Sequence, residues 1–430
     1  MILFWIFAFL YLVVLYVGIN HFLKFDGLIS TFSVFGITGF FYYLALPIEC
    51  VITGNDYISL GDNIQNPLSD NTKIAIAFMS LLGLIGFYFG LKCSKFSHNV
   101  EQGAASLRHG ARSKGILFFV FTSFVILIIL FGKKIVLSGT YEGNVSTSYN
   151  NPFYTLLVDW IVISCSVLCG ASIIRSRRIN FWAMLLSAPG FYWGVYASTK
   201  DQMLIAILGL LTYFTVVNPI KNIFTLIFGF ISLIFVAPMA LLLFSLYRSG
   251  VIINQFVLFN VFENGIIRNT DPAGPLAVFN DLFNSNKDFK YGLTYLDTFY
   301  LLIPKFVWST RPLDVAEKYA RETMLNWLPG QGLGYSLLIE GYLNFSYIGV
   351  LLQYFIIGLL WGITWNSVKN LVLKISVDIW LSLYSVFGFF LLVIIHRSPF
   401  SGTPKQMFLT LPILLVALFL FKRKKSVNAK

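Results

Sequence analysis

The stretch with the clearest chemical potential runs from Gly332 to Phe345, where polar side chains recur at intervals of four residues. Ser336, Glu340 and Asn344 hold these positions, and a helix would place all three on one face. The stretch leads into a long apolar run, and a glutamate at membrane depth costs free energy unless it is paired or hydrated. Glu340 is therefore a candidate catalytic residue. A salt bridge that only holds a helix bundle together is the alternative interpretation.

Basic side chains form a second group, because several of them stand between an apolar run and a turn. Arg248 precedes Ser-Gly, Arg311 precedes a proline and Arg397 precedes Ser-Pro, while Lys200 follows another apolar run. A guanidinium group binds phosphate oxygens through two parallel hydrogen bonds and stays charged at any pH. Converging arginines would therefore neutralise a pyrophosphate group without a metal ion. Each residue alone also suits a simple anchor at the membrane surface.

The signatures of nucleotide and metal chemistry are missing. The sequence contains no G-x-x-x-x-G-K-[ST], no H-E-x-x-H, no C-x-x-C and no D-x-D, so neither a metal ion nor another cofactor is expected. Cys165 and Cys169 lie one helical turn apart within an apolar run, where they fit packing positions. Asp159, in the same run, is interpreted as a member of a structural ion pair.

The elements that must position these residues are membrane spans. Of 430 residues, 57% are hydrophobic and 12% charged, whereas a soluble domain carries about 25% charged residues. A helix needs about 20 mainly apolar residues to cross a bilayer. About eleven runs meet this condition, and they lie near Ile2–Phe22, Gly27–Pro47, Ile74–Leu91, Ile116–Leu130, Phe153–Ile174, Phe181–Ser198, Met203–Asn218, Ile223–Tyr247, Phe345–Trp365, Ile379–Ile395 and Met407–Phe421.

The distribution of basic residues predicts the orientation of these spans. Positive residues next to spans stay in the cytoplasm, so the tail that begins with Lys422-Arg423 places the C-terminus inside. Alternation then leaves 17 basic and 3 acidic residues inside, and 14 basic and 16 acidic residues outside. The net charge of +12 is therefore explained by membrane threading, and no nucleic-acid partner is expected. The N-terminus is predicted outside, and an even number of spans with the N-terminus inside is the alternative.

The predicted fold is an all-α bundle of transmembrane helices in three parts. Residues 1–247 carry eight spans, residues 248–344 form a large outer loop, and residues 345–430 carry three spans and a basic cytoplasmic tail. Within the loop, apolar stretches at Val251–Phe262 and Tyr295–Trp308 predict short interfacial helices. Prolines at Pro189-Gly190 and Pro238 are expected to interrupt two of the spans, and turns are expected at Asp271–Pro275 and Pro329–Gly332 within the loop.

Three blocks of this sequence resemble the bacterial O-antigen and capsule repeat-unit polymerases of the Wzy type. The blocks are Arg248 after a long span, the segment Ile303–Pro312, and the Gly-x-Ser-x-x-x-Glu-x-Tyr-x-Asn-Phe-x-Tyr-Ile-Gly pattern of Gly334–Gly349. The resemblance extends from about Thr199 to Gly402, half of the chain. Lys200 stands where many relatives have an arginine, so the two-pronged phosphate contact of an arginine is missing there.

The resemblance implies an inverting glycosyl transfer on the outer face of the bacterial plasma membrane. A growing glycan on undecaprenyl pyrophosphate would move to the sugar end of a new lipid-linked repeat unit, and the lipid pyrophosphate would leave. The energy lies in the phosphoester, in agreement with the missing nucleotide motif. A protein that regulates chain length is an implied partner, besides the lipid-linked oligosaccharide and membrane lipid.

The resemblance also suggests roles for individual residues. Arg248, Arg311 and Arg397, with Lys200, would hold the donor pyrophosphate. Glu340 would activate or orient the acceptor hydroxyl. The remaining candidate substrate-binding residues are the polar Ser336 and Asn344 and the aromatic Tyr335, Trp308 and Trp327, whose rings would stack on sugars.

Two other functions use similar features. A lipid-glycan ligase takes the same donor on the same face and has a similar large loop. A flippase or exporter of polysaccharide predicts internally repeated halves and charged residues within the transport pathway.

Overall fold

The structure is a computed structural model, and two compact units account for the whole chain. It describes residues 1–26, 30–60, 64–94, 111–131, 152–196, 200–218, 239, 243, 265–270, 272–285, 288–301, 303, 308, 310–324, 327, 332–373 and 377–402. The first unit comprises residues 1–99, 219–366 and 391–405, and the second comprises residues 100–218, 367–390 and 406–430. Each unit is described by itself.

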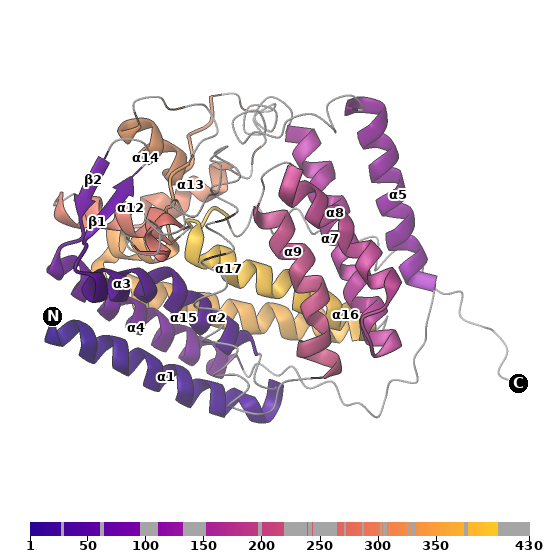
Figure 1. Ribbon diagram of the computed structural model, residues 1–430, viewed down its shortest axis with the longest axis horizontal. Coiled ribbons are helices and arrows are strands. Elements are labelled where there is room, and N and C mark those ends of the chain that lie inside the picture. Colours follow the sequence, from indigo (N-terminus) through magenta and orange to yellow (C-terminus); the bar gives the residue numbers. More distant parts are fainter. Residues whose placement is uncertain are drawn as a thin grey trace, which may run out of the picture. The chain divides into compact units, whose positions relative to one another are not determined.

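The first unit begins with apolar helices that lie side by side in Figure 1. They are α1 (Ile2–Asp26), α2 (Thr31–Gly39), α3 (Ala45–Thr53) and α4 (Asp70–Cys93), and a π-helical turn at Phe40–Leu44 joins α2 to α3. Ser30 and Ser69 start α2 and α4, because each side chain accepts the third backbone N–H of its helix. Gly54 ends α3 with a φ of 67°, a left-handed conformation that favours glycine.

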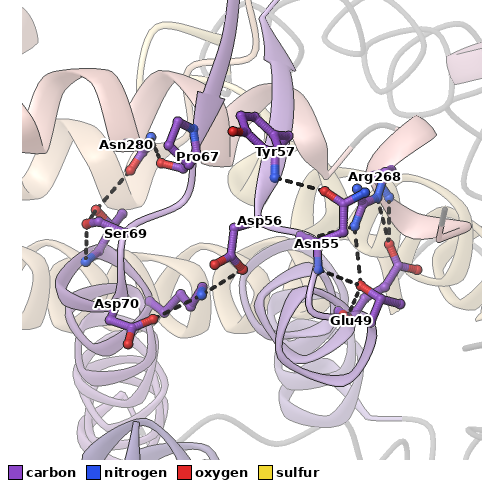
Figure 2. Close-up of polar contacts among 12 residues, drawn as sticks. Glu49, Asn55, Asp56, Tyr57, Pro67, Ser69, Asp70, Arg268 and Asn280 are labelled. Carbon is purple, nitrogen blue, oxygen red and sulfur yellow. Dashed lines mark hydrogen bonds and ion pairs between the residues drawn. The ribbon is translucent and has the colours of Figure 1, made fainter.

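A short β-hairpin follows α3 in a chain that is mostly helical, as the all-α prediction expects. Its strands are β1 (Tyr57–Leu60) and β2 (Ile64–Pro67), antiparallel with Tyr57 opposite Pro67. Polar contacts attach the hairpin to its neighbours, as Figure 2 shows. Asn280 donates to the Pro67 carbonyl over 3.1 Å, and Lys73 of α4 contacts Asp56 over 2.8 Å.

Four shorter helices of this unit come from the region predicted as the large loop. They are a 3-10 turn at Ile267–Asn269, α12 (Ala273–Asn284), α13 (Leu293–Leu301) and α14 (Val315–Thr323). α13 confirms a short helix within the predicted stretch Tyr295–Trp308, whereas Val251–Phe262 lies outside the described residues. The turn predicted at Asp271–Pro275 is met in part. Pro272 forms a turn, whereas Ala273–Pro275 already belong to the first turn of α12, where the missing N–H of proline costs no hydrogen bond, and Asp271 lies outside the described residues.

α15 (Leu337–Leu373) consists of two helical pieces. Phe345 and Ser346 between them have non-helical backbone angles, with φ at −145° and 58°. Because of this kink, the short piece that carries Glu340 is a separate helix, and the long piece begins close to Phe345, where the predicted span begins. The long piece packs closely on α4, because a side chain at Gly86 or Gly90 would collide with its backbone.

The described elements of the second unit are all helices or helical turns. It contains α5 (Ala111–Phe131), α7 (Pro152–Ser176), α8 (Phe181–Tyr196), α9 (Lys200–Thr212) and α16 (Val377–Leu383), with π-helical turns at Tyr213–Val217 and Tyr384–Gly388, and α17 (Phe389–Arg397) follows. The predicted interruption at Pro189 is wrong, since α8 continues through it. An ion pair between Arg175 and Asp378 joins α7 to α16.

Several helices are long and apolar enough to cross a membrane, and the chain is mostly helical, as predicted. Five described segments meet the criterion by length and composition, and they are Ile2–Phe22, Thr31–Thr53, Asp70–Cys93, Phe153–Ser176 and Leu337–Ser367. Shorter apolar helices lie at Ile116–Phe131, Asp201–Val217 and Leu381–Arg397. Of the spans expected at Ile223–Tyr247 and Met407–Phe421, only residues 239 and 243 are described, so the total of about eleven stays a prediction.

Candidate functional site

The predicted polar stripe lies in the interior of the first unit. Glu340 and Asn344 are one turn apart on the short piece of α15, and Ser336 directly precedes it. The exposed fractions of Ser336, Glu340 and Asn344 are 1%, 1% and 0%. The Asn344 side-chain amide donates to the Glu340 carbonyl over 2.9 Å, so the spacing of four places them in contact as expected.

The carboxylate of Glu340 receives two hydrogen bonds from neutral groups. Thr294 Oγ1 donates to Oε1 over 2.7 Å, and the backbone N–H of Phe400 donates to Oε2 over 2.6 Å. Both contacts that the described residues supply therefore lack a positive charge. Neither partner is an arginine, so these two contacts are not the structural salt bridge that was the alternative interpretation of Glu340. A buried carboxylate held by neutral donors remains able to accept a proton.

Asn344 links the same threonine to the start of α13. Its amide nitrogen donates to Thr294 Oγ1 over 2.7 Å, and its amide oxygen accepts the backbone N–H of Gly292 over 2.8 Å. Gly292 has a φ of 89°, which a residue with a Cβ rarely adopts. Thr294 thus accepts from Asn344 and donates to Glu340. Sequence reasoning missed this threonine, because nothing in the local pattern marks a partner 46 residues away.

The segment after α17 closes the site from another direction. Ser401, next to Phe400, donates from Oγ to Asp314 Oδ2 over 2.9 Å. Asp314 also caps α14 by accepting the backbone N–H of Ala316 over 3.0 Å. The ring of Phe400 meets that of Tyr295 edge to face at 5.7 Å. Three segments that are remote in sequence therefore converge on the Glu340 helix.

Arg311 uses part of its guanidinium group to end α13. Its Nη1 donates to the carbonyls of Leu301 and Ile303 over 2.6 and 2.8 Å. Its Nε is buried and lacks a hydrogen-bond partner within the part of the chain that the structure describes. Arg311 thus contacts the C-terminal end of α13 while Glu340 contacts Thr294 near the other end, and seven residues of helix span about 10 Å. A buried N–H donor without a partner can donate a hydrogen bond to an anion that comes within contact distance.

The three aromatic candidates differ in surroundings. Tyr335 is buried, and its ring packs on that of Tyr319 with centroids 6.3 Å apart, so it offers no open face to a sugar. Burial raises the pKa of the Tyr335 phenol, and the negative charge of Glu340 raises it further. Trp308 is half-buried, packs edge to face on Tyr300 and donates from Nε1 to Thr310. Trp327 is half-buried and lies in the segment that connects α14 to α15.

The remaining basic candidates lie in different parts of the chain. Arg397 ends α17, three residues before Phe400, and is half-buried. Lys200 begins α9 in the second unit. Arg248 lies outside the described residues. The structure therefore brings the Arg397 segment and Arg311 to the helices around Glu340 and leaves the other two basic positions as predictions.

Asp159, Cys165 and Cys169, which were interpreted as structural residues, all lie on α7. Asp159 Oδ1 accepts from the side-chain amide of Gln202 over 2.9 Å, a contact that joins α7 to α9. Cys165 and Cys169 are free and buried, as packing residues should be. Among the residues that the structure describes, no group of three or more His, Cys, Asp or Glu side chains could hold a metal ion.

Sequence reasoning also missed Arg268, which lies beside the hairpin (Figure 2). Its Nη2 donates to the Asn55 carbonyl over 2.8 Å, and its Nε lies 3.7 Å from Glu49 Oε1. Glu49 also accepts the backbone N–H of Ile267 over 2.8 Å. An arginine with these contacts fixes the residues after Gly265 to the end of α3, so its basic charge already has a structural use.

Comparison of the chain with models of protein families, with characterised proteins and with solved structures finds no significant match.

Proposed function

We propose that this chain is an integral-membrane glycosyltransferase of the bacterial plasma membrane. It polymerises oligosaccharide repeat units carried on undecaprenyl pyrophosphate, on the outer face of that membrane. The observation that carries the proposal is the Glu340 carboxylate, which is buried at the end of an apolar helix and held by the neutral donors Thr294 and Phe400. The resemblance of Gly334–Gly349 to the polymerases supports it, since it places the glutamate within the shared pattern.

In the proposed reaction, a hydroxyl of the acceptor sugar attacks the anomeric carbon of the donor glycan. The new C–O bond forms as the bond between that carbon and the pyrophosphate oxygen breaks, and the configuration inverts. Glu340 takes the proton of the attacking hydroxyl, because a carboxylate without a cationic partner keeps its affinity for a proton. The leaving group is the lipid pyrophosphate, and it takes both electrons of the broken bond.

Basic side chains stabilise the negative charge of the leaving group. Arg311 supports this role, since its buried Nε has no partner among the described residues. Arg311 contacts Leu301 at one end of α13, and Glu340 contacts Thr294 near the other end of the same helix. Arg397 lies in the segment that also reaches Glu340, while Arg248 and Lys200 complete the proposed set. No metal ion takes part in this proposal.

The test replaces Glu340 by glutamine, which has the same shape and no negative charge. Removal of a catalytic base lowers the rate by on the order of 10²–10⁴, so a strain that carries only Glu340→Gln should make single repeat units in place of long glycan chains. Asp159→Asn is a matched control, since it also removes a half-buried carboxylate from an apolar helix. Long chains at normal protein levels in the Glu340→Gln strain would overturn the role of Glu340.

Deletion of the gene tests the reaction class itself. A polymerase mutant shows single capped repeats on a glycan gel, whereas a ligase mutant accumulates polymer on its lipid carrier. A flippase mutant retains single repeats on the inner face. The proposal requires the first pattern, and either of the other two contradicts it.

A further inference from the structure

The two faces of α13 reverse the pattern of a helix on a water-exposed surface. Such a helix turns its apolar side chains inward and its polar ones toward water. In α13 the most exposed side chains are apolar and recur at intervals of three or four residues, at Leu293, Leu296, Phe299 and Tyr300. The buried side chains are the polar Thr294 and Thr298, with exposed fractions of 8% and 3%. The outer face therefore fits an apolar environment outside the protein.

The inner face of α13 belongs to the site around Glu340. Thr294 donates to Glu340 Oε1 over 2.7 Å, and Arg311 donates to the Leu301 carbonyl at the C-terminal end of α13. Thr298 stands between these contacts along the helix, and its Oγ1 is buried without a hydrogen-bond partner in the part of the chain that the structure describes. α13 is therefore polar on the side of the carboxylate and apolar on the opposite side.

The outer face of α13 adjoins the exposed stripe of a candidate membrane span. From its kink onward, α15 exposes apolar side chains at intervals of three or four residues, at Phe345, Ile348, Leu352, Ile356, Leu360 and Ile363. This segment of α15 is long and apolar enough to cross a membrane. The backbone N–H of Gly292, directly before α13, donates to the Asn344 side chain over 2.8 Å, and a side chain at Gly292 would touch the ring of Phe345. The surroundings of the stripe therefore reach the start of α13.

The next helix along the chain, α14, has the opposite kind of exposed surface. Its exposed side chains are charged, and they are Lys318, Arg321 and Glu322. α14 flanks the same site, because its capping residue Asp314 accepts from Ser401, next to the residue whose N–H reaches Glu340. Charged side chains are costly in hydrocarbon, whereas an apolar face is costly in water. The boundary between hydrocarbon and water therefore passes between α13 and α14.

Aromatic residues with polar tips stand at both ends of α13. Tyr291, which is exposed, precedes the helix, and Tyr300 near its other end packs edge to face on Trp308 with centroids 5.8 Å apart. Tyrosine and tryptophan collect where a membrane meets water. The nine residues of α13 extend over about 13 Å, whereas the hydrocarbon core measures ~30 Å. The helix therefore fits a position along the membrane surface and is too short to cross the membrane.

We propose that α13 lies in the surface layer of the membrane and forms the wall between lipid hydrocarbon and the Glu340 carboxylate. The partner of its outer face is the acyl chains of the bilayer, into which the apolar face of an interfacial helix is inserted. Its inner face meets the carboxylate through Thr294. The inference goes beyond the proposed function, since it does not depend on the reaction assigned to Glu340.

The test measures how two relaxation agents reach nitroxide spin labels on the full-length protein in phosphatidylethanolamine and phosphatidylglycerol vesicles. Oxygen concentrates in hydrocarbon, whereas a polar nickel chelate stays in water. The exposed Cys93 is first replaced by serine, and the protein without an introduced cysteine gives the background. Single labels are then attached through Leu296→Cys and Phe299→Cys on α13, with Glu322→Cys on α14 as the water control and Leu352→Cys on α15 as the hydrocarbon control.

The ratio of oxygen to nickel accessibility at positions 296 and 299 should exceed that at position 322 by about tenfold, because a polar metal complex enters hydrocarbon far less readily than oxygen does. Position 352 should show a similarly high ratio. A ratio at positions 296 and 299 as low as that at position 322 means that the face meets water, which would overturn the inference. Low accessibility to both agents means that protein, for instance a second copy of this chain, covers the face, and this result would overturn it as well.

A charge on the outer face supplies a second readout. A carboxylate is disfavoured in hydrocarbon, so Phe299→Asp should lower the ratio at position 296 several-fold. Arg321→Asp places the same side chain on the exposed surface of α14 and should leave that ratio unchanged. Equal effects of the two substitutions would contradict the inference. If Phe299→Asp prevents folding, the four single labels still decide the position of the face, and none of these measurements requires turnover.

Discussion

The backbone N–H of Phe400 donates a 2.6 Å hydrogen bond to Glu340 Oε2, although the two residues are 60 positions apart. The bond joins the segment after α17 to the short helix before the long piece of α15. A peptide N–H cannot lose its donor character by a change of side chain, and only proline removes it. The Glu340 carboxylate is therefore held by a backbone group, and the identity of the Phe400 side chain gives no sign of this contact.

Phe400→Pro tests this contact directly. A hydrogen bond to a charged group contributes about 1.5–3 kcal/mol, so the variant should show shorter glycan chains than wild type. Phe400→Leu keeps the N–H and serves as the matched control, with most of the activity retained. The measurement is the chain-length distribution on a glycan gel, normalised to the amount of protein in the membrane. Equal chain lengths in the two variants would argue against the backbone contact.

Thr294→Val tests the hydroxyl that lies between Glu340 and Asn344. Valine has nearly the same shape, but it cannot donate to Glu340 or accept from Asn344. Each buried polar group left without a partner costs about 1–3 kcal/mol, so the unfolding temperature in detergent should fall. Thr294→Ser restores the hydroxyl and should recover most of the loss. If serine and valine lower the temperature equally, packing and not the hydroxyl explains the effect.

We expect the stability of the protein to depend on pH through the carboxyl group of Asp297. Burial raises the pKa of its carboxyl, Lys318 lowers it and Asp314 raises it, with a net increase. The folded state therefore keeps this proton to a higher pH than the unfolded chain does. The carboxyl opposes folding increasingly as the pH rises above its pKa in the unfolded chain, and fully once the pH exceeds its pKa in the folded state. Asp297→Asn should raise the unfolding temperature by about 1–2 °C at neutral pH, because partly exposed charges contribute less than ~1 kcal/mol.

The gain from Asp297→Asn should disappear as the pH falls below the ordinary pKa of an aspartate, since wild type is then protonated in both states. Asp288→Asn, at an exposed position shortly before α13, is the control. Differential scanning fluorimetry of both variants across the pH range measures the effect. A gain that persists unchanged in acid would contradict the assignment to ionisation.

Cysteine labelling tests the orientation of α4. Cys93 is exposed at the end of this helix, while Cys50, Cys165 and Cys169 are free and buried. Tyr57 is 58% exposed in β1, before the other end of α4. With Tyr57→Cys in place, a membrane-impermeant maleimide should label position 57 in intact spheroplasts and Cys93 only after lysis. The reverse order would invert the predicted topology.

Much of the fold could be predicted from sequence, because long apolar runs have few alternatives in a bilayer. The helices α1, α4 and α7 coincide with predicted spans to within a few residues. Several local features could not be predicted from hydropathy. Pro189 remains inside α8, and the hairpin after α3 is too short to stand out against the apolar background. The break at Phe345 and Ser346 likewise has no signal in hydropathy, because both helical pieces of α15 are apolar.

The sequence by itself determined the membrane character of this protein and the helical spacing that puts Glu340 and Asn344 in contact. Hydropathy and a period of 3.6 residues are local properties, so they can be read without the fold. Only the tertiary structure decided which groups surround the carboxylate. Thr294 and Phe400 reach Glu340 from segments 46 and 60 residues away. Such contacts depend on how the helices pack, and no spacing in the sequence records that packing.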